Sequence, residues 1–206
     1  MAEYIVDSKD LNAVASAIRE KAGSDEQLTF PSEFVSAIEG ITTGGATEPY
    51  IEETYNADEN LIGVVLHGYT WIRASAFYNC AYLILKSLPQ EITRINNYAF
   101  SGCTRLILAS LPSGLTNIGN GSFRACSSLA LTSIPSGITN VGQNAFQNCT
   151  GLTSITFEGT PRSIAANAFS GCTNLTSIKV PWAEGAVANA PWGATNAAIT
   201  YNYTGG

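Results

Sequence analysis

Five cysteines are the residues of this chain whose chemistry must be considered first, because thiolates bind zinc and pairs of thiols form disulfides. A fixed interval of 23 residues separates Cys80, Cys103, Cys126, Cys149 and Cys172. A zinc site needs ligands in close pairs of the C-x₂₋₄-C kind, which this spacing does not supply. We therefore expect no metal ligands among these cysteines.

Disulfides between these cysteines are also disfavoured. A fixed interval places them in one column of a stacked structure, where side chains in register point the same way and are poorly placed for the S–S dihedral angle. Their odd number would leave one unpaired. We expect free, buried thiols that act as small apolar groups, in a protein that folds in a reducing cytoplasm.

His67 is the single histidine, so any Ser-His-Asp or Cys-His site would have to be built around it. It lies at or just past an expected strand over residues 63–66, with no carboxylate at a fixed helical spacing. The chain also lacks the phosphate-binding, dinucleotide-binding and H-E-x-x-H motifs. The sequence predicts a protein that is not an enzyme, with no catalytic residues, metal or cofactor.

The cysteines must be positioned by sequence repeats that are 23 residues long, the same as the interval between them. An aromatic residue stands three positions before each cysteine, a leucine three after, and further apolar residues eight and fifteen after. A unit this short cannot bury its own apolar face, so it must stack on identical neighbours as a solenoid. The aromatic column consists of Phe77, Phe100, Phe123, Phe146 and Phe169.

Each repeat predicts one short strand beginning at the leucine, as in residues 83–85 and 106–108. The chain then returns through Ile95 or its equivalents to the phenylalanine, whose ring fills the rung. Extending the same phase backward predicts Val65 as an inward residue of an amino-terminal cap. The bulky residues expected to close the other end are Trp182, Trp192, Tyr201 and Tyr203.

The repeated pattern L-x-x-(L/I)-x-(L/I/V)-P…I-x-x-x-A-F-x-x-C resembles the BspA-like leucine-rich repeats, also called the Treponema pallidum type. The resemblance covers residues 60–192. It implies a right-handed slab of short parallel strands, with five 23-residue rungs plus caps, and a role in binding.

Charge divides the chain into two modules. Residues 1–59 hold 13 of the 16 carboxylates and three basic residues, a balance of −10, whereas residues 60–206 carry a balance of +4. The few basic residues of the second part do not cluster, so we expect no nucleic-acid partner. No run of 18 apolar residues and no signal-peptide pattern is present, so we expect neither a membrane span nor export.

The predicted organisation has four parts. Residues 1–41 form a two-helix assembly or docking module, 42–56 a linker, 57–192 the solenoid and 193–206 a carboxy-terminal cap strand. Two short helices cannot build an adequate core alone, so they must pack on other copies, on the solenoid or on a partner. Their candidate assembly stripe consists of Leu11, Val14, Ile18, Phe34, Val35 and Ile38.

Three segments at the two ends of the chain resemble prophage and phage tail-associated proteins. They are residues 10–21, 28–38 and 180–194. The resemblance implies that the helices dock on virion or tail components, and we expect a homo-oligomer.

Outward positions on the predicted strands form a hydroxyl-rich candidate ligand-contact face that is either a binding surface for a glycan or polar protein or an ordinary strand exterior. Its residues are Lys86, Ser87, Ala109, Ser110, Thr132, Ser133, Ser154, Thr156, Ser177 and Lys179. A second candidate is an edge beside the cysteine turns, formed by Tyr78, Tyr82, Arg105 and Arg124.

Three functions are consistent with these features. The first is a virion protein, made in the bacterial cytoplasm, whose solenoid binds a protein or glycan on a host cell surface. The second is a BspA-like adhesin at a bacterial cell surface. The third is an intracellular scaffold for protein–protein interaction.

Overall fold

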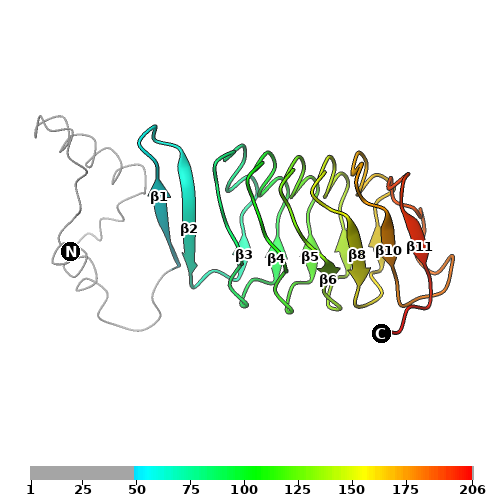
Figure 1. Cartoon of the computed structure of the whole chain (residues 1–206). Helices are drawn as coiled ribbons and strands as arrows, with labels where there is room; N and C mark the ends of the chain where they lie inside the picture. Colours follow the sequence, from blue (N-terminus) through cyan, green and yellow to red (C-terminus); the bar gives the residue numbers. More distant parts are fainter. Residues whose placement is uncertain (1–48, 206) are drawn as a thin grey trace, which may run out of the picture. The chain divides into compact units, whose positions relative to one another are not determined.

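The computed structural model describes residues 49–205, which lie within a compact unit over Glu48–Gly206 (Figure 1). The two-helix module predicted for residues 1–41, with its assembly stripe, falls in a separate unit, Met1–Thr47, outside the described residues. The described chain forms a solenoid of parallel strands, as the repeated columns predict.

A five-stranded parallel sheet occupies the return leg of each rung. Its strand order, β3-β4-β5-β7-β9, follows the chain, and its register makes Ile72, Ile95, Ile118, Val141 and Ile164 successive partners. The sheet confirms the predicted aliphatic column of the return leg. The strands are β3 (Trp71–Ile72), β4 (Arg94–Ile95), β5 (Asn117–Ile118), β7 (Asn140–Val141) and β9 (Ser163–Ile164).

A four-stranded parallel sheet occupies the first leg of the later rungs, in the order β11-β10-β8-β6. Strand β8 pairs with β10 on one side and β6 on the other, so the sheet continues across adjacent rungs. The strands are β6 (Ser133–Ile134), β8 (Ser154–Phe157), β10 (Ser177–Lys179) and β11 (Ala198–Thr200).

The strand predicted over residues 106–108, like its counterpart one rung earlier, belongs to neither sheet. The spacing of the buried side chains differs along the solenoid but does not alone decide the outcome, because Leu131 and Ile134 are also three residues apart and Ser133–Ile134 is strand β6. Ile155 and Phe157 on β8 are two residues apart, which is the period of a strand, whereas Leu108 and Leu111 are three apart. The early rungs bury their leucines from irregular backbone.

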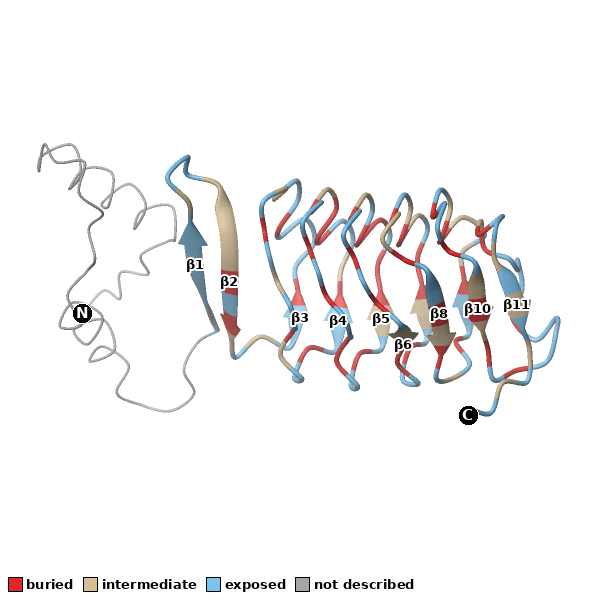
Figure 2. Ribbon diagram, in the orientation of Figure 1, coloured by how far each residue is buried: buried red, intermediate tan, exposed pale blue. Residues whose placement is uncertain are grey.

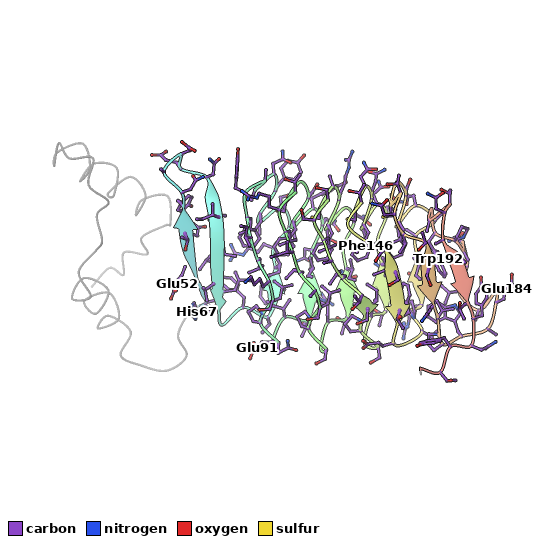
Figure 3. All side chains as sticks on the ribbon, viewed as in Figure 1. Glu52, His67, Glu91, Phe146, Glu184 and Trp192 are labelled. Carbon is purple, nitrogen blue, oxygen red and sulfur yellow. The ribbon has the colours of Figure 1, made fainter. Side chains whose placement is uncertain are left out.

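The core of the solenoid contains a stack of phenylalanine rings, one from each of five rungs. Buried residues recur along the rungs (Figure 2), and Phe146 lies among them in the middle of the solenoid (Figure 3). Neighbouring rings from Phe77 to Phe169 lie 5.1–5.5 Å apart between centroids, with interplanar angles of 5–15°. Phe100, Phe123, Phe146 and Phe169 have no exposed surface. Burying each such ring contributes about 2–3 kcal/mol on transfer scales.

An antiparallel hairpin of β1 (Tyr50–Tyr55) and β2 (Leu61–His67) begins the described chain. The linker predicted over residues 42–56 is therefore corrected at residues 50–55, which pair along most of β2. The backbone of the hairpin continues into the first rung, because the Ile84 N–H donates to the carbonyl of Ile62 at 2.9 Å.

In this hairpin, the residues that face the core are displaced by one position from those expected. Val64 and Leu66 are buried, while Val65, the predicted inward residue, is 51% exposed. Successive residues of a strand face opposite sides, so moving the phase by one residue exchanges the two faces. The 23-residue phase does not extend to β2, because this strand is held by β1 as well as by the first rung.

Tryptophans close the carboxy-terminal rungs, as predicted. Trp192 is completely buried and Trp182 is 5% exposed. Both pack edge-on or tilted against Phe157, and the two indoles lie 6.2 Å apart between ring centroids. Strand β11 then pairs with β10 as the last strand of the described sheet.

Candidate binding surface

The cysteine column forms as predicted and has a role beyond filling space. Each thiol from Cys103 to Cys172 donates to the carbonyl of the phenylalanine 26 residues earlier, with Sγ···O distances of 2.9–3.0 Å. Desolvation raises the pKa of the Cys103 thiol to about 12 and that of Cys172 to about 11. A thiol held in its neutral form is a poor nucleophile and a poor metal ligand.

All five cysteines are free thiols, and Cys80 differs from the others in being half-buried. Burial, with a smaller contribution from the Glu53 carboxylate, raises its pKa as well. Cys80 belongs to the first repeat, so no phenylalanine carbonyl from an earlier repeat stands below it. The column therefore joins one rung to the next and shows no feature of a reactive site.

His67 pairs across the hairpin with Glu52, with 3.0 Å between Nε2 and Oε1 (Figure 3). Both side chains are more than one third exposed. Among residues 49–205, no three His, Cys, Asp or Glu side chains come together as a group able to hold a metal ion. The same residues include no helix of the length and hydropathy needed to span a membrane.

The hydroxyl-rich contact face is brought together most regularly in the later rungs. Ser154 lies beside Ser177, and Thr156 lies between Ser133 and Lys179 in the register of the second sheet. Its earlier members are exposed but lie outside regular strands: Lys86, Ser87, Ala109, Ser110 and Thr132. The Lys179 ammonium lies 4.7 Å from the ring centroid of Tyr203, which engages it within the chain.

A different surface is hollowed. Ser75, Tyr78, Tyr98 and Arg124 line an open depression of about 300 Å³, which we call the tyrosine–arginine notch. This volume is at the small end of the range for small-molecule sites, about 300–1,000 Å³. Tyr78 is 54% and Tyr98 43% exposed, so both rings can be contacted from solvent.

Two of the residues that line the notch belong to one column of the repeat, in which a small residue stands between two large ones. Tyr78, Ser101 and Arg124 occupy equivalent positions on three consecutive rungs. Ser101, the small residue between the tyrosine and the arginine, is 5% exposed. Backbone hydrogen bonds fix the three rungs, since the Asn79 N–H donates to Ser101 and the Gly102 N–H to Arg124, each at 2.7 Å.

Two lining residues have an unusual backbone conformation. Ser75 and Tyr98 have φ values of +55° and +56°, in the left-handed region. The equivalent positions on the next two rungs are Gly121 and Asn144, the residue types that adopt this region most readily. A bulky aromatic residue here is strained, and such strain is concentrated at functional sites.

The polar groups of the notch are available for a ligand. Within residues 49–205, the side chains of its four lining residues make no hydrogen bond or ion pair with the protein. None of the four is acidic. The notch therefore presents a guanidinium, two phenol hydroxyls, a serine hydroxyl and two aromatic faces.

Two of the four residues predicted for the edge beside the cysteine turns line the notch. The predicted edge included Tyr78 and Arg124, which line the notch, and also Tyr82 and Arg105, which do not. It missed Ser75 and Tyr98. The available signal was Tyr98 itself, an aromatic residue at a repeat position that Gly121 and Asn144 occupy on later rungs.

Comparison with known proteins places these features in a family. Six copies of the BspA type leucine rich repeat region match residues 70–186. The structure is similar to that of a T. pallidum leucine rich repeat protein, with 25% identity and a TM-score of 0.51, over 74% of this chain and 79% of that one.

Two other solved structures show lower similarity. One is a leucine rich cell surface protein from Faecalibacterium prausnitzii, with 20% identity and a TM-score of 0.45, over 66% of this chain and 55% of that one. The other is a leucine-rich repeat protein from Bacteroides ovatus, with 21% identity and a TM-score of 0.40, over 66% of this chain and 47% of that one. No curated protein matches the sequence.

Proposed function

This chain belongs to the BspA type leucine rich repeat family, and on that basis we propose that it is a non-enzymatic binding protein whose rungs recognise a protein or glycan on a cell surface. The tyrosine–arginine notch is the observation that carries the proposal. It combines exposed aromatic rings with a guanidinium that has no partner among residues 49–205. Tyrosine and arginine are enriched where interfaces gain most of their binding energy.

The hydroxyl-rich face of the later rungs is a second candidate contact surface. Its serine and threonine side chains, such as Ser154 and Thr156, are exposed or half-buried along parallel strands. They supply hydrogen-bond donors and acceptors but no aromatic anchor. The notch is therefore the main candidate for the proposed interface, and this face is a secondary one.

The proposed setting is a phage or prophage tail, with residues 1–41 docking the chain on virion components. Support comes from the resemblance of residues 10–21, 28–38 and 180–194 to tail-associated proteins. A homo-oligomer would present several notches to one cell and gain affinity through avidity. A bacterial cell-surface adhesin is the alternative setting with the same binding role.

Binding to whole cells tests the proposal. The labelled full chain is titrated onto a panel of bacteria, beside Tyr98→Asn, Arg124→Gln and the matched control Arg162→Gln, whose arginine is exposed on a later rung. We expect binding to at least one host, reduced about tenfold or more by the two notch substitutions and unchanged by the control. Absence of cell binding, or equal binding by all variants, would contradict the proposal.

The oligomeric state tests the proposed role of the helices. Light scattering gives the mass of the full chain and of a variant with Leu11→Asp and Ile18→Asp on the apolar stripe. The control carries Asn12→Asp and Ser16→Asp, off the stripe. A closed oligomer that only the stripe variant converts to a monomer supports assembly through the helices. A monomeric full chain would contradict it.

A further inference from the structure

The chemical class of ligand follows from how the notch is built, and this inference rests on the proposed binding function. The backbone N–H groups of all four lining residues already donate to carbonyls within or between rungs, and three of their four carbonyls accept such bonds. The Tyr98 N–H donates to Asn120 and the Ser75 N–H to Asn97, at 2.8 and 2.9 Å. An extended peptide, which adds to a free strand edge through both donors and acceptors, therefore finds no free main-chain donor at the notch.

The side chains of the notch match both kinds of surface that a sugar ring presents, its C–H face and its hydroxyl groups. The C–H face of a pyranose packs against an aromatic face, and its hydroxyls bond to phenol, serine and guanidinium groups. Tyr78 and Tyr98 supply half-exposed rings from consecutive rungs, and Ser75 adds a hydroxyl beside them. The volume of about 300 Å³ suits a short ligand rather than a long apolar one.

The charge of the notch selects among sugars. Arg124 has no acidic partner among residues 49–205, and Glu91 is the single carboxylate between residues 60 and 157. A guanidinium binds a carboxylate through two parallel hydrogen bonds, which gives geometric specificity as well as attraction. We infer that the notch binds an acidic saccharide, with the sugar ring on the tyrosines and its carboxylate on Arg124.

A matched pair of probes tests this assignment. Calorimetry at about 0.15 M salt compares an α-1,4-linked galacturonic acid trimer with its methyl ester, which keeps the ring and hydroxyls but removes the charge. The full chain should prefer the acid by about tenfold. Arg124→Gln should abolish that preference, Tyr98→Asn should weaken both ligands, and Arg162→Gln should change neither.

Each alternative result overturns the inference in a recognisable way. Equal affinity for acid and ester, an acid preference retained in Arg124→Gln, or no binding of either probe contradicts an acidic-sugar site. If a tetraglutamate peptide bound more strongly than the saccharide, and this binding depended on the notch residues, the ligand would be an acidic peptide instead. In each case the whole-cell assay decides the proposed function independently, since cell binding lost in Tyr98→Asn preserves a binding role for the notch.

Discussion

The ring of Tyr98 lies over the backbone of Gly121, the equivalent residue of the next rung. A β-carbon at Gly121 would stand 2.6 Å from both Cδ1 and Cε1 of that ring, and Gly121 itself has a φ of +57°. Glycine is therefore required at this position for its lack of a side chain, and it also suits the left-handed conformation best. The exposed tyrosine of the notch depends on a residue that contacts no ligand.

Gly121→Ala is expected to weaken ligand binding several-fold, because the new methyl group displaces the Tyr98 ring from the notch. The left-handed backbone adds a stability cost of about 1 kcal/mol. Titration with the host cells or the saccharide probe measures the first effect, and denaturant unfolding the second. Gly114→Ala is the control, because its β-carbon would be 3.8 Å from the nearest atom. Unchanged binding by Gly121→Ala would show that the ring position is unimportant.

Tyr98→Asn should separate stability from function. Asparagine tolerates the left-handed region better than tyrosine, so relief of strain should raise the free energy of unfolding by up to about 1 kcal/mol. Binding should fall at the same time, because the ring is gone. Urea unfolding and calorimetry on the same preparation check both effects. A destabilised variant would indicate that the ring contributes more by packing on Gly121 than it costs in strain.

The phenylalanine stack predicts a dependence on position along the solenoid. Phe146 stacks on two neighbouring rings, whereas Phe77 stacks on one at the start of the column. Phe146→Ala should cost about 3–5 kcal/mol, and Phe77→Ala less. Denaturant midpoints measure the difference, with the exposed Tyr82→Ala as the control. Equal costs at the two sites would show that the rungs do not support one another through the stack.

Thiol labelling should distinguish one cysteine from four. Cys80 is half-buried, while the other four thiols are buried and bonded to carbonyls. Iodoacetamide under native conditions should therefore modify Cys80 well before the rest, and all five in denaturant. Peptide mass spectrometry locates the label, and Cys80→Ser should remove the fast reaction. Rapid labelling of Cys126 in the native protein would contradict the buried column.

The raised thiol pKa values predict a loss of stability in alkali. The folded protein holds the Cys103 proton to a pKa of about 12, whereas the usual value is 9.0. Stability from this group is therefore fully present below pH 9 and falls as the pH rises toward 12. The melting temperature should fall over this range, and less steeply in Cys103→Ser, whose hydroxyl does not titrate there. Identical slopes would argue against the thiols as the cause.

The repeated columns made the solenoid predictable, because the phenylalanine, cysteine and return-leg aliphatic residues each recur every 23 positions. The strands of the first leg of each rung were less predictable. The buried Leu108 lies one residue earlier in its repeat than Ile155 does, and so does Leu131, yet only the leg of Leu131 contains a paired strand, β6. A consensus does not show this difference. Strand β1 was missed because residues 50–55 lie outside the repeat and pair with β2 rather than with a rung.

The notch was harder to predict for a different reason. Its lining residues come from three rungs and are close only when those rungs are stacked in register. Tyr98 stands at a position that glycine and asparagine normally fill, and sequence alone does not show which side of the rung its ring covers. What the sequence did show was the arginine and one tyrosine of the same column, Arg124 and Tyr78.

The stacking of equivalent rungs also has a consequence for heredity. Unequal recombination between two repeats removes or adds 23 residues and leaves every column in register, so the product still folds. Tyr78, Tyr98 and Arg124 come from three consecutive repeats, however, and loss of the middle one removes Tyr98 and Ser101 together. Such an event would change recognition in one step while sparing the fold, which makes the number of repeats itself a heritable switch of ligand specificity.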